Sequence, residues 1–563
     1  MRVGWFAVLL TMGAIGACGV GSEFPPSLGG DDGTGPGDGG SDADVPSFGP
    51  VIAPSDDPST CDQAAQWQSY VGCDFWPTVT ANIVWSIFDF AVVVANAGYA
   101  PAQVTVTGPG GTNQSVTVAP NQLAKIYLPW VPALKGTDTD SCGTELPLSA
   151  SVLAAGAAYH LVSSVPVTVY QFNALEYGPT GGPAGKDWSS CPGSQLCTDT
   201  SSPFNGQKVG CYSFTNDSSL LLPSTALTGN YRITSYPGQT ATGSDGGALP
   251  IMGSFVAITG ITDGTHVKVF VSPTGDVVAG AGVAATAASK ELDLTLDSGD
   301  VAELVSDLGD HFDLSGSLVT ADQPIQVISG APCEYVPEAS PACDHLEQSV
   351  FPAETLGKQY FVSLPSGPLG RAVGHVVRLY GNVDGTTLTY APQTPAGCPA
   401  TLDAGQVVDC GVVNFDFEVT GNNEFAVGTF MLGGSIVDPP TPTSGGGLGD
   451  PSQSMVASVE QYRTKYVFLA PDDYDVNLID VIAPAGTELV LDGASVQWGE
   501  VAGIADGYDV WRVGILPTNG GAHLLEASAP VGMQVLGYGL YTSYQYPAGL
   551  NLKRIAPPPG PTQ

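Results

Sequence analysis

The chain has 563 residues, of which 43% are hydrophobic, so it is long enough for several domains and can bury substantial cores. Its 54 acidic and 16 basic residues give a formal charge of −38 at pH 7, and a surface this acidic argues against nucleic acid as a partner. The 73 glycines and 46 prolines favour strands joined by tight turns over long helices.

The first 18 residues are predicted to be a secretory signal. Arg2 precedes an apolar run over residues 3–17, which is shorter than the ~20 residues that span a bilayer. The run ends in IGAC (15–18), and a cysteine directly after small residues resembles the lipobox of bacterial lipoproteins. That resemblance implies cleavage before Cys18 and attachment of acyl chains such as palmitate to it, which would make the membrane a partner. An ordinary signal peptide is the alternative.

Residues 19–58 are predicted to be a disordered tether. The stretch GGDDGTGPGDGGSDADVP (29–46) has almost no large apolar side chain, so it cannot bury enough surface to offset the entropy of ordering. Calcium could bind these aspartates, but a flexible acidic stretch has no fixed cage, which favours the spacer. Gly19 stands where many inner-membrane lipoproteins carry aspartate, so we expect the outer membrane or the cell surface.

From residue 61 to residue 546, short runs of branched and aromatic residues alternate with turn formers. FAVVVANAG (90–98), VTVTGPGG (104–111) and VVRLYGNVDGTTLTY (376–390) are typical of strands and hairpins. The best candidate for a helix is the short stretch 60–70. The predicted fold class is therefore all-β.

Weak internal repeats divide this region. Asp-Gly-Thr recurs at 263–265 and 384–386, and Tyr231, Tyr360 and Tyr466 open three later segments in register. The segment length suits a small β-sandwich better than a propeller blade. We therefore predict tandem β-sandwich-like modules, stapled by disulfides. The predicted order is module 1 at 61–178, a cysteine-containing excursion at 179–211, module 2 at 212–336, module 3 at 350–437, a linker at 438–457, module 4 at 458–546 and a disordered tail at 547–563.

The cysteine count agrees with export. Of eleven cysteines, all but Cys18 form an even set, which favours disulfides in an exported chain. The candidates are Cys61, Cys73, Cys142, Cys191, Cys197, Cys211, Cys333, Cys343, Cys398 and Cys410. Three near pairs stand out (61 with 73, 333 with 343, 398 with 410), although sequence alone leaves the connectivity open. A zinc site is disfavoured, because Cys191 and Cys197 are too widely spaced and no paired histidines accompany them.

No catalytic signature is found. The Gly-x-Ser-x-Gly, HExxH and phosphate-loop patterns are absent, and the six histidines are scattered. They are His160, His266, His311, His345, His375 and His523. We expect satisfied structural roles for His266 and His375, which lie in strand-like runs. The prediction is that the protein is not an enzyme and has no catalytic residue.

The stretch PDDYDVNLID (471–480) partly resembles a calcium-binding loop. Asp473, Asp475 and Asn477 alternate as in an EF-hand, but Leu478 takes the glycine position and Pro484 the final glutamate position. An EF-hand is therefore excluded, and a β-type calcium site with distant residues remains open. No other cofactor is expected.

Aromatic residues near the C-terminus offer a possible glycan platform. The candidates are Trp498, Trp511, Tyr541, Tyr544 and Tyr546. Amphipathic rings pack sandwich cores as readily, and we favour core packing, as for Trp76 and Trp85 in the first module.

Several motifs resemble one known family. They are GCDFWPTVTANIV (72–84), VVVANAG (92–98), LLLPSTAL (220–227) with the Tyr231 segment, and VTADQPIQVISG (319–330). They resemble the IgGFc-binding protein N-terminal domain, homologous stretches of which occur in bacterial surface lipoproteins of the myxobacterial type. The resemblance covers roughly residues 61–546. It implies an extracellular binding or adhesion module and marks no functional residue.

Together these features predict a lipid-anchored bacterial cell-surface protein that binds an unidentified extracellular protein or glycan. One alternative is a secreted, carbohydrate-active hydrolase that uses dispersed carboxylates. Another is a structural envelope lipoprotein without a ligand.

Overall fold

Alternating apolar and polar residues build most of the strands. In β13 (Thr265–Phe270) and β14 (Glu291–Leu296) every second residue is buried, and the others are exposed except Phe270, which is half-buried. The computed structural model describes residues 57–138, 147–178, 181–187, 213, 215–242, 248–338, 340, 342–441, 446–497, 499–515 and 521–559. Cys18, most of the predicted tether, Cys142, Cys191, Cys197 and Cys211 lie outside these residues.

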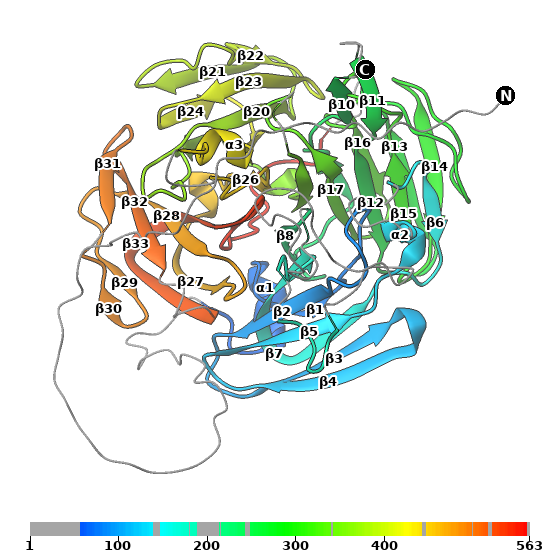
Figure 1. Cartoon of the computed structure of the whole chain (residues 1–563), viewed down its shortest axis with the longest axis horizontal. Helices are drawn as coiled ribbons and strands as arrows, with labels where there is room; N and C mark the ends of the chain where they lie inside the picture. The colour runs from blue at the N-terminus through cyan, green and yellow to red at the C-terminus, as the bar shows by residue number, and fades with distance from the viewer. Residues whose placement is uncertain are drawn as a thin grey trace.

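Four β modules surround a common centre, which confirms the predicted all-β fold of tandem sandwich-like units (Figure 1). In Figure 1 the chain passes around the ring from the blue first module through the green second and yellow third modules to the orange fourth. The ring brings the first and last modules side by side, where β2 contacts β27.

The first module is a sheet of order β4-β3-β7-β2-β5, to which β1 and β8 add through β7. The long strand β7 bends and joins both halves of this sandwich. The elements are α1 (Cys61–Trp67), β1 (Gly72–Phe75), β2 (Phe90–Asn96), β3 (Ala102–Gly108), η1 (Pro109–Gly111), β4 (Thr112–Val118), β5 (Gln122–Leu128), α2 (Pro132–Lys135), β7 (His160–Asn173) and β8 (Asp217–Leu220). The predicted helix at 60–70 is confirmed as α1, which the Thr60 side chain caps by accepting from the Gln63 N–H at 3.2 Å.

The second module is a sandwich of the sheets β18-β17-β12-β15-β6 and β14-β13-β16-β9. Branched residues from both sheets, such as Ile258 and Val267, form its core. Besides β13 and β14 its strands are β6 (Val152–Ala154), β9 (Asn230–Arg232), β12 (Phe255–Gly260), β15 (Val301–Val305), β16 (Leu318–Ala321), β17 (Ile325–Glu334) and β18 (Asp344–Ser349), with a separate hairpin of β10 (Gln239–Thr242) and β11 (Ala248–Met252).

The third module repeats this plan with the sheets β19-β24-β21-β22 and β23-β20-β25-β26. Its elements are η3 (Ala353–Thr355), β19 (Gln359–Val362), β20 (His375–Gly381), β21 (Thr386–Ala391), β22 (Thr401–Leu402), β23 (Val407–Val413), β24 (Phe417–Gly421), β25 (Phe425–Met431), α3 (Gly434–Val437) and β26 (Gln453–Met455).

In the fourth module a single long strand, β33, joins both halves of the sandwich, as β7 does in the first. The elements are η4 (Val459–Gln461), β27 (Arg463–Ala470), β28 (Val476–Pro484), β29 (Leu489–Leu491), β30 (Ala494–Ser495), β31 (Glu500–Gly503), β32 (Tyr508–Ile515), β33 (Gly521–Gly539) and β34 (Thr542–Pro547).

A tyrosine clasp recurs in the last three modules and accounts for the predicted tyrosine register. The hydroxyls of Tyr231, Tyr360 and Tyr466 donate to main-chain carbonyls at 2.5–2.7 Å. The accepting carbonyls belong to Ile325, Phe425 and Val531. Each hydroxyl also accepts from the main-chain N–H three residues before the tyrosine. The clasp thus ties the opening strand of a module to the strand that closes its sandwich.

The Asp-Gly-Thr repeats also form matching structures. The main-chain N–H groups of Gly264 and Gly385 donate to Asp297 and Asp403, each at 2.9 Å. Both glycines have φ near +70°, a conformation that costs glycine little, so the turn requires this residue.

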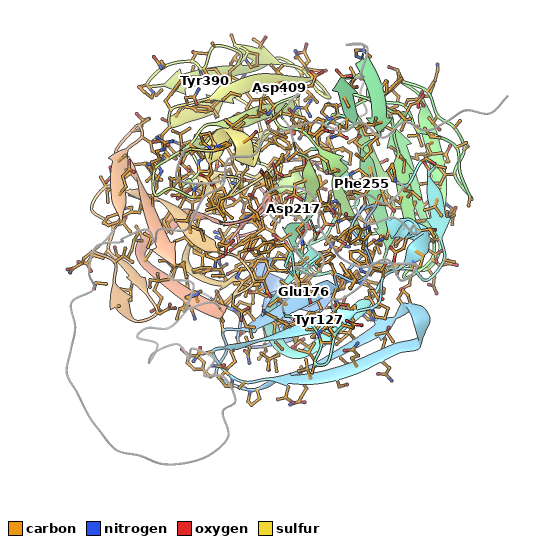
Figure 2. All side chains as sticks on the ribbon, in the orientation of Figure 1. Tyr127, Glu176, Asp217, Phe255, Tyr390 and Asp409 are labelled. Carbon is orange, nitrogen blue, oxygen red and sulfur yellow. A yellow bond between two sulfur atoms is a disulfide. The ribbon has the colours of Figure 1, made fainter. Side chains whose placement is uncertain are left out.

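One strand from each module, β8, β18, β26 and β34, lies at the centre of the ring, where β8 contacts β18 and β34, and β26 contacts the same two strands. Asp217 of β8 lies in this central region, whereas Tyr390 and Asp409 of the third module lie near the rim (Figure 2). Each central strand pairs with the sheet of its own module before the chain leaves for the next module.

These central strands correct the predicted module boundaries. β8 was assigned to the second module but pairs with β7 of the first, β18 lies beyond the predicted end at 336, and β26 lies in the predicted linker 438–457. The predicted tail is also wrong at its start, because Leu550 and Leu552 are buried and the N–H of Tyr70 donates to the Leu550 carbonyl. All four segments are held in place by contacts between modules. A local sequence pattern does not predict such contacts.

Replacing Tyr360 by phenylalanine tests the clasp. We expect Tyr360→Phe to lower the free energy of unfolding by about 1–3 kcal/mol, because it removes a buried hydroxyl and leaves two main-chain groups without a partner. Urea unfolding followed by fluorescence measures this. Tyr99→Phe is the control, because Tyr99 is 69% exposed, and its effect should stay within about 0.5 kcal/mol. Equal midpoints for both variants would contradict the clasp.

Candidate functional site

Several buried acidic groups lie at the ring centre. Asp217 accepts from the main-chain N–H groups of Ser218, Glu347 and Gln453 and from the Ser452 hydroxyl, at 2.7–3.1 Å. It therefore joins its own strand β8 to β18 and β26.

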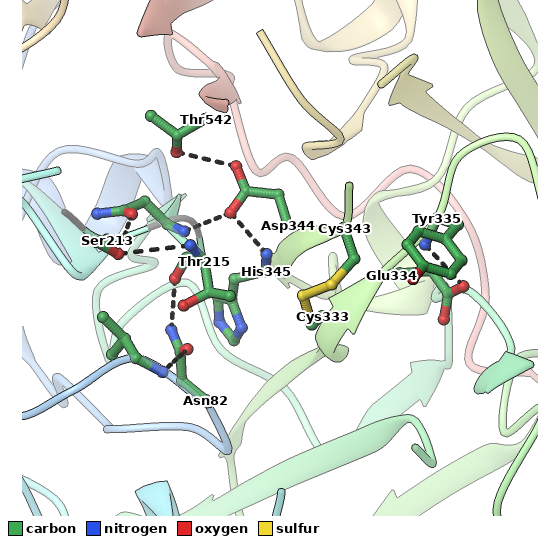
Figure 3. Close-up of a disulfide and its surroundings, with 12 residues drawn as sticks. Asn82, Ser213, Thr215, Cys333, Glu334, Tyr335, Cys343, Asp344, His345 and Thr542 are labelled. Atoms are coloured by element: carbon green, nitrogen blue, oxygen red, sulfur yellow. Dashed lines mark hydrogen bonds between the residues drawn. A yellow bond between two sulfur atoms is a disulfide. The ribbon is translucent and has the colours of Figure 1, made fainter. Parts of the chain in front are cut away.

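Asp344 of β18 likewise joins its own strand to neighbouring segments of the centre (Figure 3). Its carboxylate accepts from the main-chain N–H groups of Asn216, His345 and Ser543 and from the Thr542 hydroxyl, at 2.5–3.1 Å. Burial raises the pKa of both Asp217 and Asp344 well above the ordinary value, and the donors oppose that rise. Because both side chains are fully buried and every carboxylate oxygen is engaged, this centre is a structural network.

Asp450, in the segment before β26, completes this central group. Its Oδ1 accepts from the Gly434 N–H at 3.1 Å, and its buried Oδ2 has no hydrogen-bond partner among the described residues. Burial raises the Asp450 pKa to about 8.

The histidines occupy separate structural settings. His160 contacts Asp74 at 2.7 Å and stacks on Trp76, and His523 contacts Asp492 at 2.7 Å. Ser224 donates to Asp74, so the carboxylate lies between serine and imidazole, whereas a catalytic triad needs the imidazole between them.

Of the two histidines predicted to have satisfied roles in strands, His266 has a side-chain partner and His375 has none among the described residues. His375 is buried in β20, but neither ring nitrogen has a hydrogen-bond partner among the described residues, and burial lowers its pKa to about 3. His266 is exposed on β13, and its Nδ1 lies 3.4 Å from the Thr295 hydroxyl of β14. Of the other two, His345 is buried against Phe255, and His311 is exposed near Asp310.

The candidate calcium residues bind protein groups instead. Asp473 pairs with Lys125 of the first module at 2.9 Å, Asp475 accepts from Tyr177 at 2.6 Å, and Asn477 accepts from Tyr544 at 2.7 Å. These contacts tie the fourth module to the first and the strands of the fourth to one another. Across the described ranges, no group of three or more histidine, cysteine, aspartate or glutamate side chains is arranged to hold a metal ion.

The candidate aromatic residues do not form an exposed platform among the residues that the structure describes. Tyr544 and Tyr546 are fully buried, and Tyr546 packs against Tyr170 of the first module. Trp511 is half-buried on β32, while Trp498 lies outside the described residues. Trp76 is buried as expected and Trp85 is half-buried.

The near pairs of cysteines form disulfides. Cys61 is bonded to Cys73, Cys333 to Cys343 and Cys398 to Cys410. Figure 3 shows the bond of Cys333 in β17 to Cys343, directly before Asp344. Closing loops this short stabilises the fold by roughly 2–3 kcal/mol per bond, and this bond holds the start of the central strand β18 in place.

An open polar surface lies on the second module. There β13, β14 and β16 form a concavity of about 500 Å³. The strand register places polar side chains in two rows across it: Thr295, His266 and Asp322 in one, and Asp293, Lys268 and Thr320 in the other. We call these six residues the outer face. It is the strongest candidate for a binding site, because its side chains present both donors and acceptors to solvent.

The outer face is acidic at its rim. Lys268 pairs with Glu291 at 2.5 Å and Asp293 at 3.4 Å, and all three side chains are about half exposed or more. The charge is therefore mixed within the face and negative overall, which suits a partner surface carrying basic groups. Sequence reasoning singled out only His266 here, although the strict alternation THVKVF and ELDLTL already places these side chains on one face.

Comparison with known proteins gives two matches. A family model described as IgGFc binding protein matches residues 217–537, more than half of the chain, and the outer face lies within it. The human IgGFc-binding protein is 27% identical over 272 residues, which cover 47% of this chain and 5% of the human protein. No solved structure matches the chain. Among the described residues no helix has the length and hydrophobicity of a membrane span.

The buried Asp450 predicts a pH dependence of stability. Its pKa is raised from 3.8 to about 8 in the folded protein, so the folded state holds a proton that the unfolded state releases between these pH values. Stability contributed by this group is therefore present below pH ~4 and falls as the pH rises to ~8, by at most about 1.4 kcal/mol per pH unit.

Asp450→Asn should remove this part of the decline, because the amide does not titrate and keeps the acceptor for Gly434. Urea unfolding at pH 4–9 measures it. Asp62→Asn, at an exposed position in α1, should retain the wild-type slope. An unchanged slope in Asp450→Asn would show that the carboxyl does not hold the extra proton.

Proposed function

The chain belongs to the IgGFc binding protein family, and on this basis we propose that it is a lipid-anchored bacterial surface protein that binds an extracellular protein through the outer face of its second module. The single observation that carries the binding proposal is this open, two-row polar surface inside the family-matching region. The rest of the ring holds this surface in place.

The character of the outer face supports a protein partner. Side chains on the strands of a sandwich are held in fixed positions, so donors and acceptors keep a defined spacing. Lys268, His266 and two threonines lie among carboxylates, which allows hydrogen bonds and ion pairs to a partner of mixed polarity.

The anchor rests on sequence. Cys18 follows a secretory signal and small residues, and the Gly- and Asp-rich segment after it provides a spacer. Several acyl chains together hold a protein on a bilayer firmly, whereas one chain is marginal. Disulfides agree with an oxidising, extracytoplasmic location.

Replacing the lipid-accepting cysteine tests the anchor. We expect Cys18→Ser to move the protein from the membrane fraction to the soluble fraction and to abolish palmitate labelling. Fractionation and metabolic labelling with an alkyne fatty acid measure both. Cys61→Ser is the control, because it removes a thiol that the structure places in a disulfide and should leave the labelling intact. Unchanged labelling in Cys18→Ser would contradict the anchor.

Reversing charges on the outer face and at its rim tests the binding surface. The first probe is the Fc fragment of human immunoglobulin G, since the name of the human relative states that ligand. The variant Glu291→Lys with Asp293→Lys should slow association by about tenfold, because like charges then face a basic partner. Surface plasmon resonance at two salt concentrations measures this.

The matched control is Glu488→Lys with Glu500→Lys, which makes the same change of net charge on exposed positions of the fourth module. An equal loss in both double variants would attribute the effect to bulk charge and contradict the site. Failure of the wild-type chain to bind Fc would exclude Fc as the ligand, and the same variants then test any secreted protein that it does bind.

A further inference from the structure

One long segment of this acidic chain carries no charge. Between Asp89 and Lys125 there is no aspartate, glutamate, lysine, arginine or histidine, although the whole chain has a formal charge of −38. This segment includes β2 and the hairpin of β3 and β4. β2 is fully buried, but β3 and β4 both have exposed residues, so the lack of charge is not explained by burial alone.

β4 is a free edge. It stands at the end of its sheet and pairs only with β3, in an unbroken register from Val118 opposite Ala102 to Thr112 opposite Gly108. Figure 1 shows it at the perimeter of the ring, on the outer side of the first module. Asn113, Ser115 and Thr117 are exposed on its outward face, where Ser115 and Thr117 contact the neighbouring side chains of β3 at 3.2 and 2.9 Å.

Three other edge strands, β14, β31 and β23, carry features that block pairing with another chain. β14 has Glu291 and Asp293, β31 begins at Glu500, and β23 has Asp409 and an irregular register with β20. Charges and bulges of this kind prevent edge-to-edge association. β4 has neither, and no proline interrupts it.

We propose that β4 pairs antiparallel with β4 of a second copy of this chain, centred on Ser115, to form a two-fold dimer. The edge is self-complementary: Ser115 lies opposite its own equivalent, and Asn113 lies opposite Thr117, with all outward side chains on one face. A second copy is the occupant that the charges favour. Two acidic molecules repel over most of their surfaces, and they can approach most closely where both lack charge.

The dimer gives the binding surface a second function. Each copy contributes one outer face, so a dimer would hold two of them, and two linked sites bind a repetitive or bivalent partner more tightly than one. This consequence depends on the proposed function, whereas the pairing of β4 does not.

Sedimentation velocity of the full chain over a range of concentrations at physiological salt tests the dimer. We expect a concentration-dependent dimer for the wild type. Ser115→Lys should raise the dissociation constant by about tenfold or more, because it places two like charges directly opposite each other. Thr107→Lys is the matched control: it is exposed on β3 in the same hairpin, one strand in from the edge, and should leave the dimer intact.

Cross-linking provides a second measurement, which detects the formation of a new bond instead of the weakening of the dimer. Under oxidation Ser115→Cys should form a disulfide between two chains, seen at twice the mass without reductant, and Thr107→Cys should not. A monomeric wild type, an undiminished dimer in Ser115→Lys, or equal weakening by both lysine variants would overturn the proposal. A dimer that forms without the Ser115→Cys cross-link would place the contact elsewhere and would overturn it too.

Discussion

The hydrogen-bonded polar centre is the constraint on which the ring depends. Asp217 and Asp344 are fully buried, and each accepts four hydrogen bonds from strands of other modules or from its own strand. A buried carboxylate that lost these donors would keep its desolvation cost without compensation. The central strands therefore reach a low free energy only when all of the modules are in place, which couples folding of the ring.

Further contacts within single modules add to this centre. The tyrosine clasp ties the opening strand of a sandwich to its closing strand, and the Asp-Gly-Thr turn fixes the hairpin beside it. Disulfides secure short loops. These contacts do not use the exposed side chains of the outer face or of β4. The outer face of the second module and the edge of β4 are thus free to contact other molecules.

The sequence predicted the parts of the fold that have a local pattern. Period-two alternation indicated strands such as β13 and β14, and the repeated tyrosines indicated modules because each has the same neighbours in its own unit. The central strands were not predicted. DSSL, DHLEQS and QSM are short and polar, and such residues usually lie in turns. They form strands here because neighbouring modules satisfy their polar groups.

The candidate site, too, was predicted from the sequence only in part. The alternation in THVKVF placed His266 and Lys268 on one side of a strand, whereas no such alternation in HVVRLYG indicated that His375 would be buried. By itself the sequence determined the strands with a local pattern, the near pairs of cysteines and the acidic charge, because these depend on neighbouring residues or on composition. Only the tertiary structure decided which sheet faces stay open, which edges stay unpaired and where the carboxylates find donors, because those depend on how whole modules pack against one another.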